Sequence, residues 1–273
     1  MATVVERSDR LIAYRTLAIG EPWCDDVRPP ILFQHGLGLH GEMWLPWARE
    51  LLVHGRVLLP DLRGHGESAA AWQEKAYGED ELAADVVSVL DHAGIDRCHY
   101  VGESFGGTLG LVVAARWPER IRSLTLCSTA FRGATISNIG GWPDLVFSED
   151  GMAKWSAEIS AGRFDAASVG RIADWVDEAQ RSLEPRVVAG LVRCLQAVDL
   201  TDVLPSLTTP VLVLAPAGSP FINLESARAL HRALPFGEIV YLHDAMHGAA
   251  LTHWQDCAAA TSRFIDRANR GPA

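Results

Sequence analysis

One serine lies in a pattern of residues that can make it a nucleophile. Residues 99–107 read His-Tyr-Val-Gly-Glu-Ser-Phe-Gly-Gly, so Ser104 stands between two glycines in the pattern Gly-x-Ser-x-Gly. An apolar run typical of a buried strand precedes the pattern, and a helical repeat begins directly after it. A tight strand-to-helix turn presents the serine hydroxyl, and the amino end of the helix favours negative charge that develops beside it. We therefore expect Ser104 to attack a carbonyl carbon; the alternative is a glycine-rich turn in which the serine only caps the helix.

A second glycine-rich segment, residues 35–38 (His-Gly-Leu-Gly), ends the first expected central strand. Attack on a carbonyl creates an oxyanion, which a pair of backbone N–H groups can stabilise. We expect these donors to come from Leu37 and Phe105, one from each loop. His35 would then be structural, with its ring packed beneath the loop.

A histidine near the carboxyl end of the chain can supply the general base. His247 follows the last expected strand, in Leu-His-Asp-Ala-Met-His-Gly (242–248), and such a loop can bring its imidazole to Ser104. His253 is the rival, at the start of the final helix. His243 and His247 have the i, i+4 spacing of zinc ligands, but the segment reads as a loop and lacks the glutamate of His-Glu-x-x-His. We expect neither a metal nor a cofactor.

The elements that must position these residues alternate between strand and helix. Apolar positions such as 82, 86, 89 and 93 recur at helical spacing between short aliphatic runs. This alternation predicts an α/β fold with a mostly parallel sheet and helices on both faces, and an antiparallel edge hairpin that includes residues 11–19. The expected central strands are 31–35, 56–60, 97–101, 121–127, 211–215 and 238–242.

The alternation stops in the middle of the chain, where residues 131–205 show helical patterns and no convincing strand. We expect this segment to form a helical cap, while residues 1–130 and 206–273 form the core. Such a cap would cover the carboxyl edge of the sheet, where open α/β sheets bind ligands. Two of its tryptophans, Trp142 and Trp155, are candidates for the wall of a substrate pocket. Two arginines of the segment, at positions 132 and 163, could bind a substrate carboxylate, although we expect both to be solvated.

The composition restricts the classes of partner. Hydrophobic residues make up 48% of the chain and charged residues 21%, which is typical of a folded globular protein. The net charge of −10 opposes binding to nucleic acid or to an anionic membrane. No signal-peptide pattern or membrane-length apolar run is present, and five scattered cysteines fit reduced thiols. We expect a cytoplasmic protein, monomeric or homodimeric, that acts on a small molecule.

Taken together, the motifs resemble the α/β-hydrolase superfamily over nearly the whole chain. Residues 60–68, Pro-Asp-Leu-Arg-Gly-His-Gly-Glu-Ser, are similar to the D-x-R-G-x-G-x-S loop of these enzymes, which is largely architectural. Asp61 and Arg63 are therefore not expected to be catalytic. Residues 116–130 and 199–205 are similar to segments of 3-oxoadipate enol-lactonases. The resemblance implies hydrolysis of a small carboxylic ester or lactone through an acyl-enzyme on Ser104.

The chain departs from the family pattern at the third member of the catalytic triad. The family usually carries an aspartate in a loop after the penultimate strand, and here Ser219 occupies that place. The end of the preceding strand, which supplies the acid in some relatives, reads Cys-Ser-Thr-Ala (127–130) and has no carboxylate either. Of the carboxylates near these places, Glu225 should face outward, Asp244 is too close to His247 in the sequence to orient it, and Glu103 is a weaker candidate still.

Three interpretations of this departure stay open. In the first, Ser219 accepts a hydrogen bond from His247 and holds its tautomer, which suffices for an activated substrate such as an enol-lactone or a thioester. The acid orients the imidazole without attacking the substrate, and its loss from a serine protease lowers turnover about 3 × 10⁴-fold. In the second, a carboxylate comes from an unexpected place. In the third, the chain has a non-hydrolytic role, such as ligand binding; C–C bond hydrolysis is a further alternative.

Overall fold

A mixed eight-stranded sheet runs through the centre of the molecule. The computed structural model describes residues 3–7, 10–19, 28–71, 77–165 and 170–270, and the statements below concern those residues. The strand order is β1-β2-β4-β3-β5-β6-β7-β8. β2 pairs antiparallel with both of its neighbours, β1 and β4, and the six strands from β3 to β8 are mutually parallel. The strands are β1 (Thr3–Arg7), β2 (Arg10–Leu17), β3 (Ile31–Gln34), β4 (Val57–Pro60), β5 (Cys98–Glu103), β6 (Ile121–Cys127), β7 (Val211–Pro216) and β8 (Gly237–Leu242).

The central strands are buried on both faces, which explains their continuous apolar runs. Every residue of β7 is buried; Val211 and Val213 pack into one hydrophobic cluster, whereas Leu212 and Leu214 pack into another. This division follows from the two-residue period of a strand, which sends successive side chains to opposite faces. All six strands expected from the sequence for this part of the sheet are present, with β8 as a partly exposed edge strand, and the α/β fold class is confirmed. The segment 11–19 does belong to an antiparallel edge, on which β1 is the outermost strand.

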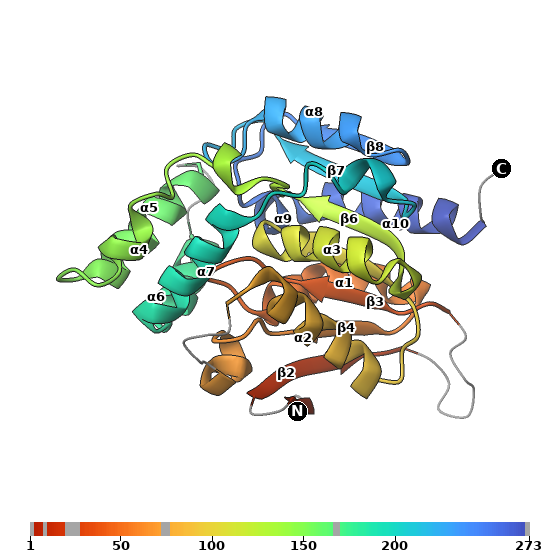
Figure 1. Cartoon of the computed structure of the whole chain (residues 1–273), viewed down its shortest axis with the longest axis horizontal. Helices are drawn as coiled ribbons and strands as arrows, with labels where there is room; N and C mark the ends of the chain where they lie inside the picture. The colour runs from red at the N-terminus through yellow and green to blue at the C-terminus, as the bar shows by residue number, and fades with distance from the viewer. Residues whose placement is uncertain (1–2, 8–9, 20–27, 72–76, 166–169, 271–273) are drawn as a thin grey trace.

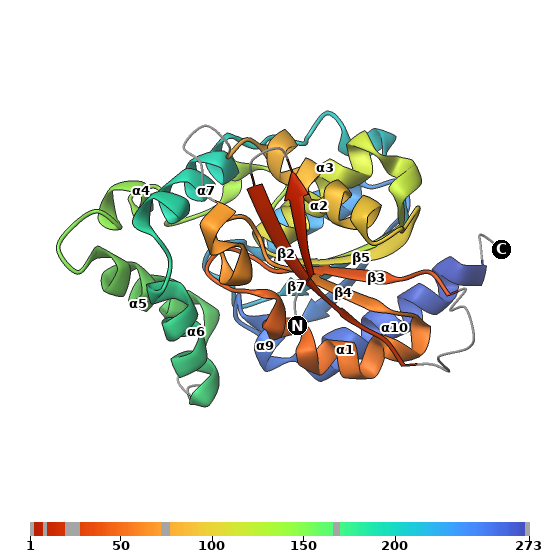
Figure 2. The same cartoon turned by 90° about the horizontal axis from the view of Figure 1, so that it is seen from below.

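Helices cover both faces of the sheet (Figures 1 and 2). The helices α2 (Glu79–His92), α3 (Phe105–Arg116) and α8 (Leu224–Ala233) contribute to the first cluster on one face. The helices α1 (Leu45–Leu51), α9 (Ala249–Thr252) and α10 (Trp254–Arg270) contribute to the second cluster on the other face. No helix in these described ranges is long and apolar enough to span a membrane.

Four α-helices of the described residues are inserted between β6 and β7 and lie together beside the sheet (Figure 1). They are α4 (Trp142–Leu145), α5 (Gly151–Arg163), α6 (Arg171–Arg181) and α7 (Pro185–Ala197). A third hydrophobic cluster joins these inserted helices to Leu37 and Phe105, which follow β3 and β5. The inserted helices therefore contact the carboxyl end of the sheet. Their separation as a cap domain over residues 131–205 stays a prediction.

The loop after β4 forms hydrogen bonds to neighbouring elements, which agrees with the architectural role expected from the sequence. Arg63 is buried and donates two hydrogen bonds to Asp85 Oδ2 on α2, at 3.0 and 2.5 Å. Asp61 accepts hydrogen bonds from the N–H groups of Gly41 (2.7 Å) and Glu67 (2.9 Å).

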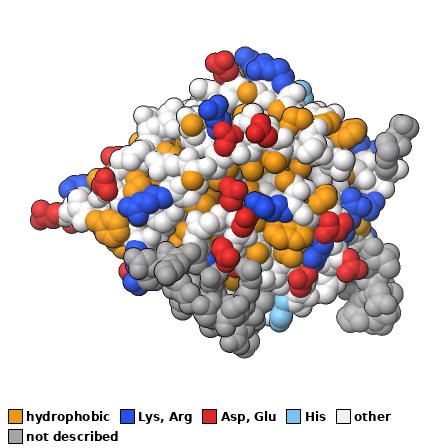
Figure 3. Space-filling model, in the orientation of Figure 1, with side chains coloured by type: hydrophobic (Ala, Val, Ile, Leu, Met, Phe, Trp, Pro, Cys, Tyr) orange, Lys and Arg blue, Asp and Glu red, His pale blue; other side chains and the backbone are white. Residues whose placement is uncertain are grey.

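The charged surface side chains and the free cysteines concern the expected binding partners and the expected cytoplasmic location. Acidic and basic side chains are interspersed over the face drawn in Figure 3. Four cysteines are free and buried, namely Cys98, Cys127, Cys194 and Cys257, and Cys24 lies outside the described residues. The cytoplasmic location and the homodimer stay predictions.

Candidate active site

Ser104 occupies a strained turn between β5 and α3. Its φ of 51° lies in the left-handed region that residues other than glycine rarely adopt. The flanking glycines permit the turn: a Cβ on Gly106 would lie 2.3 Å from Gln34 O, and one on Gly102 would lie 2.6 Å from the Gly106 backbone. The Ser104 side chain makes no capping hydrogen bond to α3. Its hydroxyl is therefore not used by the helix and points toward another partner.

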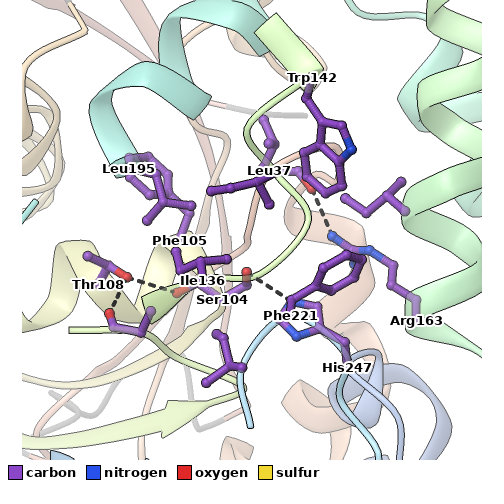
Figure 4. A pocket seen from close by; sticks show the side chains of 14 residues that line it. Leu37, Ser104, Phe105, Thr108, Ile136, Trp142, Arg163, Leu195, Phe221 and His247 are labelled. Carbon is purple, nitrogen blue, oxygen red and sulfur yellow. Dashed lines mark hydrogen bonds between the residues drawn. The ribbon is translucent and has the colours of Figure 1, made fainter. Parts of the chain in front are cut away.

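That partner is His247, whose ring faces Ser104 (Figure 4) and, on its other side, Ser219. His247 Nε2 is 3.1 Å from Ser104 Oγ, and His247 Nδ1 is 3.1 Å from Ser219 Oγ. Two hydrogen bonds hold the backbone of His247 in place: its N–H donates to Gly162 O of α5, and its carbonyl accepts from the Ser128 hydroxyl. The fold thus assembles the three side chains into one hydrogen-bonded chain.

The rival histidines lie elsewhere. His253 Nδ1 bonds to the neighbouring Thr252 hydroxyl at 2.9 Å, and His243 is exposed whereas His247 is buried. Among the described residues, no group of three or more His, Cys, Asp or Glu side chains is arranged to hold a metal ion.

Ser219 stands after β7, in the position where the family pattern has a carboxylate. Its Oγ accepts a hydrogen bond from Ile222 N at 3.2 Å, which leaves one lone pair and one proton for the contact with His247. A carboxylate there could only accept from Nδ1 and would hold the proton on that nitrogen, as a base at Nε2 requires. A hydroxyl can accept or donate, so it permits both tautomers of His247.

The other carboxylates do not replace the missing acid. Glu225 and Asp244 are exposed. Glu103 is buried next to Ser104, and the groups that face its carboxylate are the Arg163 guanidinium and the Gly36 backbone, not His247. Both ring nitrogens of His247 therefore bond to serines. Burial raises the pKa of Glu103, and the nearby Arg163 guanidinium opposes this shift.

The environment of His247 favours its neutral form. Burial lowers its pKa to about 3, and the positive charge of Arg163 adds to the effect. The imidazole is consequently unprotonated at neutral pH, which is the form that accepts a proton. Its conjugate acid is poorly stabilised, so proton transfer from an ordinary alcohol costs more here than beside a carboxylate.

Two buried histidines hold the loop that carries Leu37. His35 Nε2 accepts from Leu62 N at 2.8 Å, so its proton is on Nδ1, which donates to Gly36 O at 2.8 Å. This carbonyl belongs to the same peptide group as the Leu37 N–H. His35 therefore orients the N–H that was expected to face an oxyanion, and this role is more specific than the packing expected from the sequence. His65 Nε2 accepts from Gly38 N at 3.2 Å.

The second expected donor, the Phe105 N–H, opens α3. The N–H of a first helical residue has no acceptor within its own helix. Leu37 and Phe105 both line the cavity that Ser104 lines, so the two expected donors belong to the same site as this serine.

A small cavity lies beside Ser104 and His247 (Figure 4). Its volume is about 30 Å³, room for about two water molecules, so any larger molecule must displace some of the surrounding side chains. Trp142 lines it, as expected from the sequence. Trp155 does not: it packs edge-on behind Trp142, with ring centroids 6.1 Å apart. The full wall consists of Leu37, Ser104, Phe105, Thr108, Ala130, Ile136, Ile139, Trp142, Ile159, Arg163, Leu195, Phe221, Ile222 and His247.

Arg163 corrects an expectation from the sequence. It is the last residue of α5, and its side chain is 1% exposed rather than solvated. Its Nη2 donates to Leu37 O at 2.8 Å, and its Nη1 lies 3.6 Å from Glu103 Oε1. Arg132, in contrast, is exposed and pairs with Asp199 at 3.2 Å. No local sequence signal separates the two arginines, because only the packing of α5 buries one of them.

Comparisons with known proteins agree with this architecture. The family model described as alpha/beta hydrolase fold matches residues 29–243. The chain is 26% identical over 236 residues to 3-oxoadipate enol-lactonase 2 of Acinetobacter baylyi, covering 83% of this chain and 86% of that protein. It is 25% identical over 263 residues to a putative carbamate hydrolase, RutD, of a Caulobacter species, covering 87% and 91%.

Solved structures extend the likeness to three dimensions. The enol-lactonase from Burkholderia xenovorans superposes with a TM-score of 0.85 at 25% identity, covering 97% of this chain and all of that one. A hydrolase from Pseudomonas aeruginosa superposes with a TM-score of 0.87 at 22% identity, covering 97% and 98%.

Proposed function

Because this chain belongs to the alpha/beta hydrolase fold family and is a hydrolase, we propose that it cleaves small carboxylic esters or lactones through an acyl-enzyme on Ser104. The observation that carries the proposal is the hydrogen-bonded chain Ser104–His247–Ser219 above the strained turn. The enol-lactonases among its relatives support this bond type, and the carbamate hydrolases support acyl transfer more generally.

The proposed reaction assigns one task to each group. His247 Nε2 accepts the proton as Ser104 Oγ attacks the carbonyl carbon, and the N–H groups of Leu37 and Phe105 bind the oxyanion. His247 then gives the proton to the leaving alkoxide, which in a lactone remains attached to the acyl group. Water attacks the acyl-enzyme with His247 again as base, and the acid is released as Ser104 recovers its proton.

Ser219 acts as a positioning residue in this scheme. When Nδ1 donates to Ser219 Oγ, Nε2 is free to accept the proton from Ser104. Without a carboxylate the imidazolium is less stable, and the low pKa of His247 acts in the same direction. The scheme therefore favours substrates with a good leaving group, such as aryl esters, enol-lactones or thioesters, over alkyl esters.

The test is covalent labelling by a fluorophosphonate, followed by intact-protein mass. We expect the wild type to gain one phosphonyl group, and the Ser104→Ala and His247→Ala variants to gain none under the same conditions. Circular dichroism of each variant checks that it is folded. A folded wild type that stays unlabelled after prolonged exposure would exclude the acyl-enzyme.

A non-hydrolytic, ligand-binding role is the second candidate, and the serine in place of the acid is the observation that favours it. That role predicts stoichiometric binding without turnover, and binding that survives Ser104→Ala. A panel of esters, lactones and C–C bond substrates, assayed with the labelled and unlabelled enzyme, separates ester hydrolysis from both this role and C–C bond hydrolysis.

A further inference from the structure

The guanidinium of Arg163 is buried in the wall of the cavity with unused donors. Its Nη2 bonds to Leu37 O, but its Nε and Nη1 have no hydrogen-bond partner among the described residues. A buried donor without an acceptor is unfavourable, and more so when it carries a charge. Such a group is retained at low cost only if another molecule accepts its hydrogen bonds.

The nearest carboxylate does not meet this need. Glu103 Oε1 lies 3.6 Å from Arg163 Nη1, which is close enough for an ion pair but beyond hydrogen-bond distance. Glu103 is also absent from the cavity wall, whereas Arg163 is part of it. Burial raises the pKa of Glu103 and the guanidinium opposes this shift, but the ion pair between them leaves the Nε–H and Nη1–H groups of Arg163 without a hydrogen-bond acceptor.

The rest of the described cavity wall offers little other polar recognition. Apart from the proposed catalytic pair, its polar side chains are Thr108 and Arg163. The Thr108 hydroxyl is already bonded to Ala130 O at 2.7 Å. Within this wall, Arg163 is therefore the side chain that has N–H groups left for a ligand.

The attachment of Arg163 places those donors close to the reaction. Its Nη2 bonds to the carbonyl of Leu37, and the N–H of the same residue is the proposed oxyanion donor. A group held by Arg163 therefore lies in the same cavity as the Ser104 hydroxyl.

We propose that Arg163 binds a carboxylate of the substrate, so that the protein acts on half-esters or on lactones that carry a nearby carboxylate. A guanidinium fits a carboxylate because its N–H groups are charged donors held in a rigid plane, and an N–H donor of Arg163 that has no acceptor can form a charge-assisted hydrogen bond to a carboxylate oxygen. This inference rests on the proposed function of Ser104 and His247, and it specifies in addition that the substrate carries a negative charge.

The kinetic test compares two substrates of equal size that differ in charge: monoethyl succinate and its uncharged amide, ethyl succinamate. For the wild type, we expect a kcat/KM at least tenfold higher for the half-ester. Arg163→Gln should remove this preference, and Arg132→Gln, which changes the exposed arginine, should keep it. Equal kcat/KM values in the wild type, or a preference that survives Arg163→Gln, would overturn the proposal.

A binding test separates this inference from the proposed function. Isothermal titration calorimetry with succinate and with succinamide needs no turnover, so it is informative even if fluorophosphonate labelling fails. We expect wild-type binding of succinate at least tenfold tighter than that of succinamide, and equal or tighter binding of succinate by Glu103→Gln. The Glu103→Gln variant also serves if Arg163→Gln does not fold. Succinate binding no tighter than that of succinamide would refute the inference.

Discussion

Replacing Ser219 by aspartate should increase activity, because it supplies the charge that the site lacks. The structure already provides a donor on each side of the new carboxylate: His247 Nδ1 lies 3.1 Å from Ser219 Oγ, and Ile222 N lies 3.2 Å from it. In Ser219→Asp the side chain can only accept from Nδ1, so the proton is held there and Nε2 remains the base. The negative charge also raises the pKa of His247, which is about 3 in the wild type.

Two estimates limit the expected rise in kcat of Ser219→Asp. A unit charge about 4 Å from the imidazolium stabilises it by about 4 kcal/mol at an effective dielectric constant of about 20. Loss of the acid in a complete triad lowers turnover by about 3 × 10⁴-fold, or about 6 kcal/mol. Because residue 219 is buried, the desolvation of the new carboxylate reduces the net stabilisation below both of these energies. We expect a rise in kcat of about 100- to 1,000-fold, which corresponds to about 3 to 4 kcal/mol.

The assay is the initial rate of 4-nitrophenyl acetate hydrolysis between pH 5 and 9, for the wild type and three variants. Ser219→Asn matches the size of aspartate without its charge, and Ser219→Ala removes the hydrogen bond. The expected order of kcat is Ser219→Asp, wild type, then Ser219→Ala, with Ser219→Asn well below Ser219→Asp. If a folded Ser219→Asp is no faster than Ser219→Asn, the contact between Ser219 and His247 does not control the base, and the reasoning fails.

Three further predictions concern the oxyanion loop, acid stability and the cavity. His35→Gln keeps an acceptor for Leu62 N but no donor for the Gly36 carbonyl, so kcat for 4-nitrophenyl acetate should fall about 10- to 100-fold. His35→Asn retains a donor at the position of Nδ1 and should recover most of the lost kcat. Equal losses in the two variants would contradict the proposed role of His35 in orienting the Leu37 N–H. Burial lowers the pKa values of His35, His65 and His247 to about 3, so between pH 6.5 and 3 the unfolded chain binds protons that the folded one does not. The free energy of unfolding should therefore decrease with falling pH by about 1.4 kcal/mol per pH unit for each histidine, and urea titrations of the wild type and His35→Asn should differ by one such contribution; identical slopes would refute the assignment. Trp142→Phe enlarges the cavity and should raise the ratio of kcat/KM for hexanoyl over acetyl 4-nitrophenyl esters about tenfold, whereas an unchanged ratio would place the acyl chain elsewhere.

The local sequence determined the fold and the turn that carries Ser104. Buried parallel strands need continuous apolar runs, and helices that cover them need apolar residues at helical spacing, so the positions of the central strands could be predicted from residue types alone. The Gly-x-Ser-x-Gly pattern has a local cause at Gly102, because a side chain there would overlap the Gly106 backbone. The strand runs, the helical spacing and this contact depend on residues close together in the chain, which a sequence displays directly. At Gly106 the overlap is with Gln34 of β3, so the need for the second glycine comes from the tertiary structure.

The tertiary structure decided which distant groups meet. Ser104 and His247 are 143 residues apart, and Ser219 and His247 are 28 apart, yet each pair lies within hydrogen-bond distance. The sequence suggested these partners only through the order of the strands that carry them. The structure also showed that the ring of His247 meets two serines and no carboxylate in the described residues, a fact that depends on side-chain geometry.

The inserted helices were the least predictable part of the site. Trp142 and Trp155 are alike in the sequence, but only Trp142 reaches the cavity, because Trp155 packs behind it. Arg163 ends an ordinary-looking helix, and the sequence favoured a solvated side chain. It is buried because backbone bonds from His247 and Gly248 to the end of α5 draw that helix against the sheet. Sequence periodicity reports which residues avoid water along one element, whereas the contact between two elements depends on how all of them pack together.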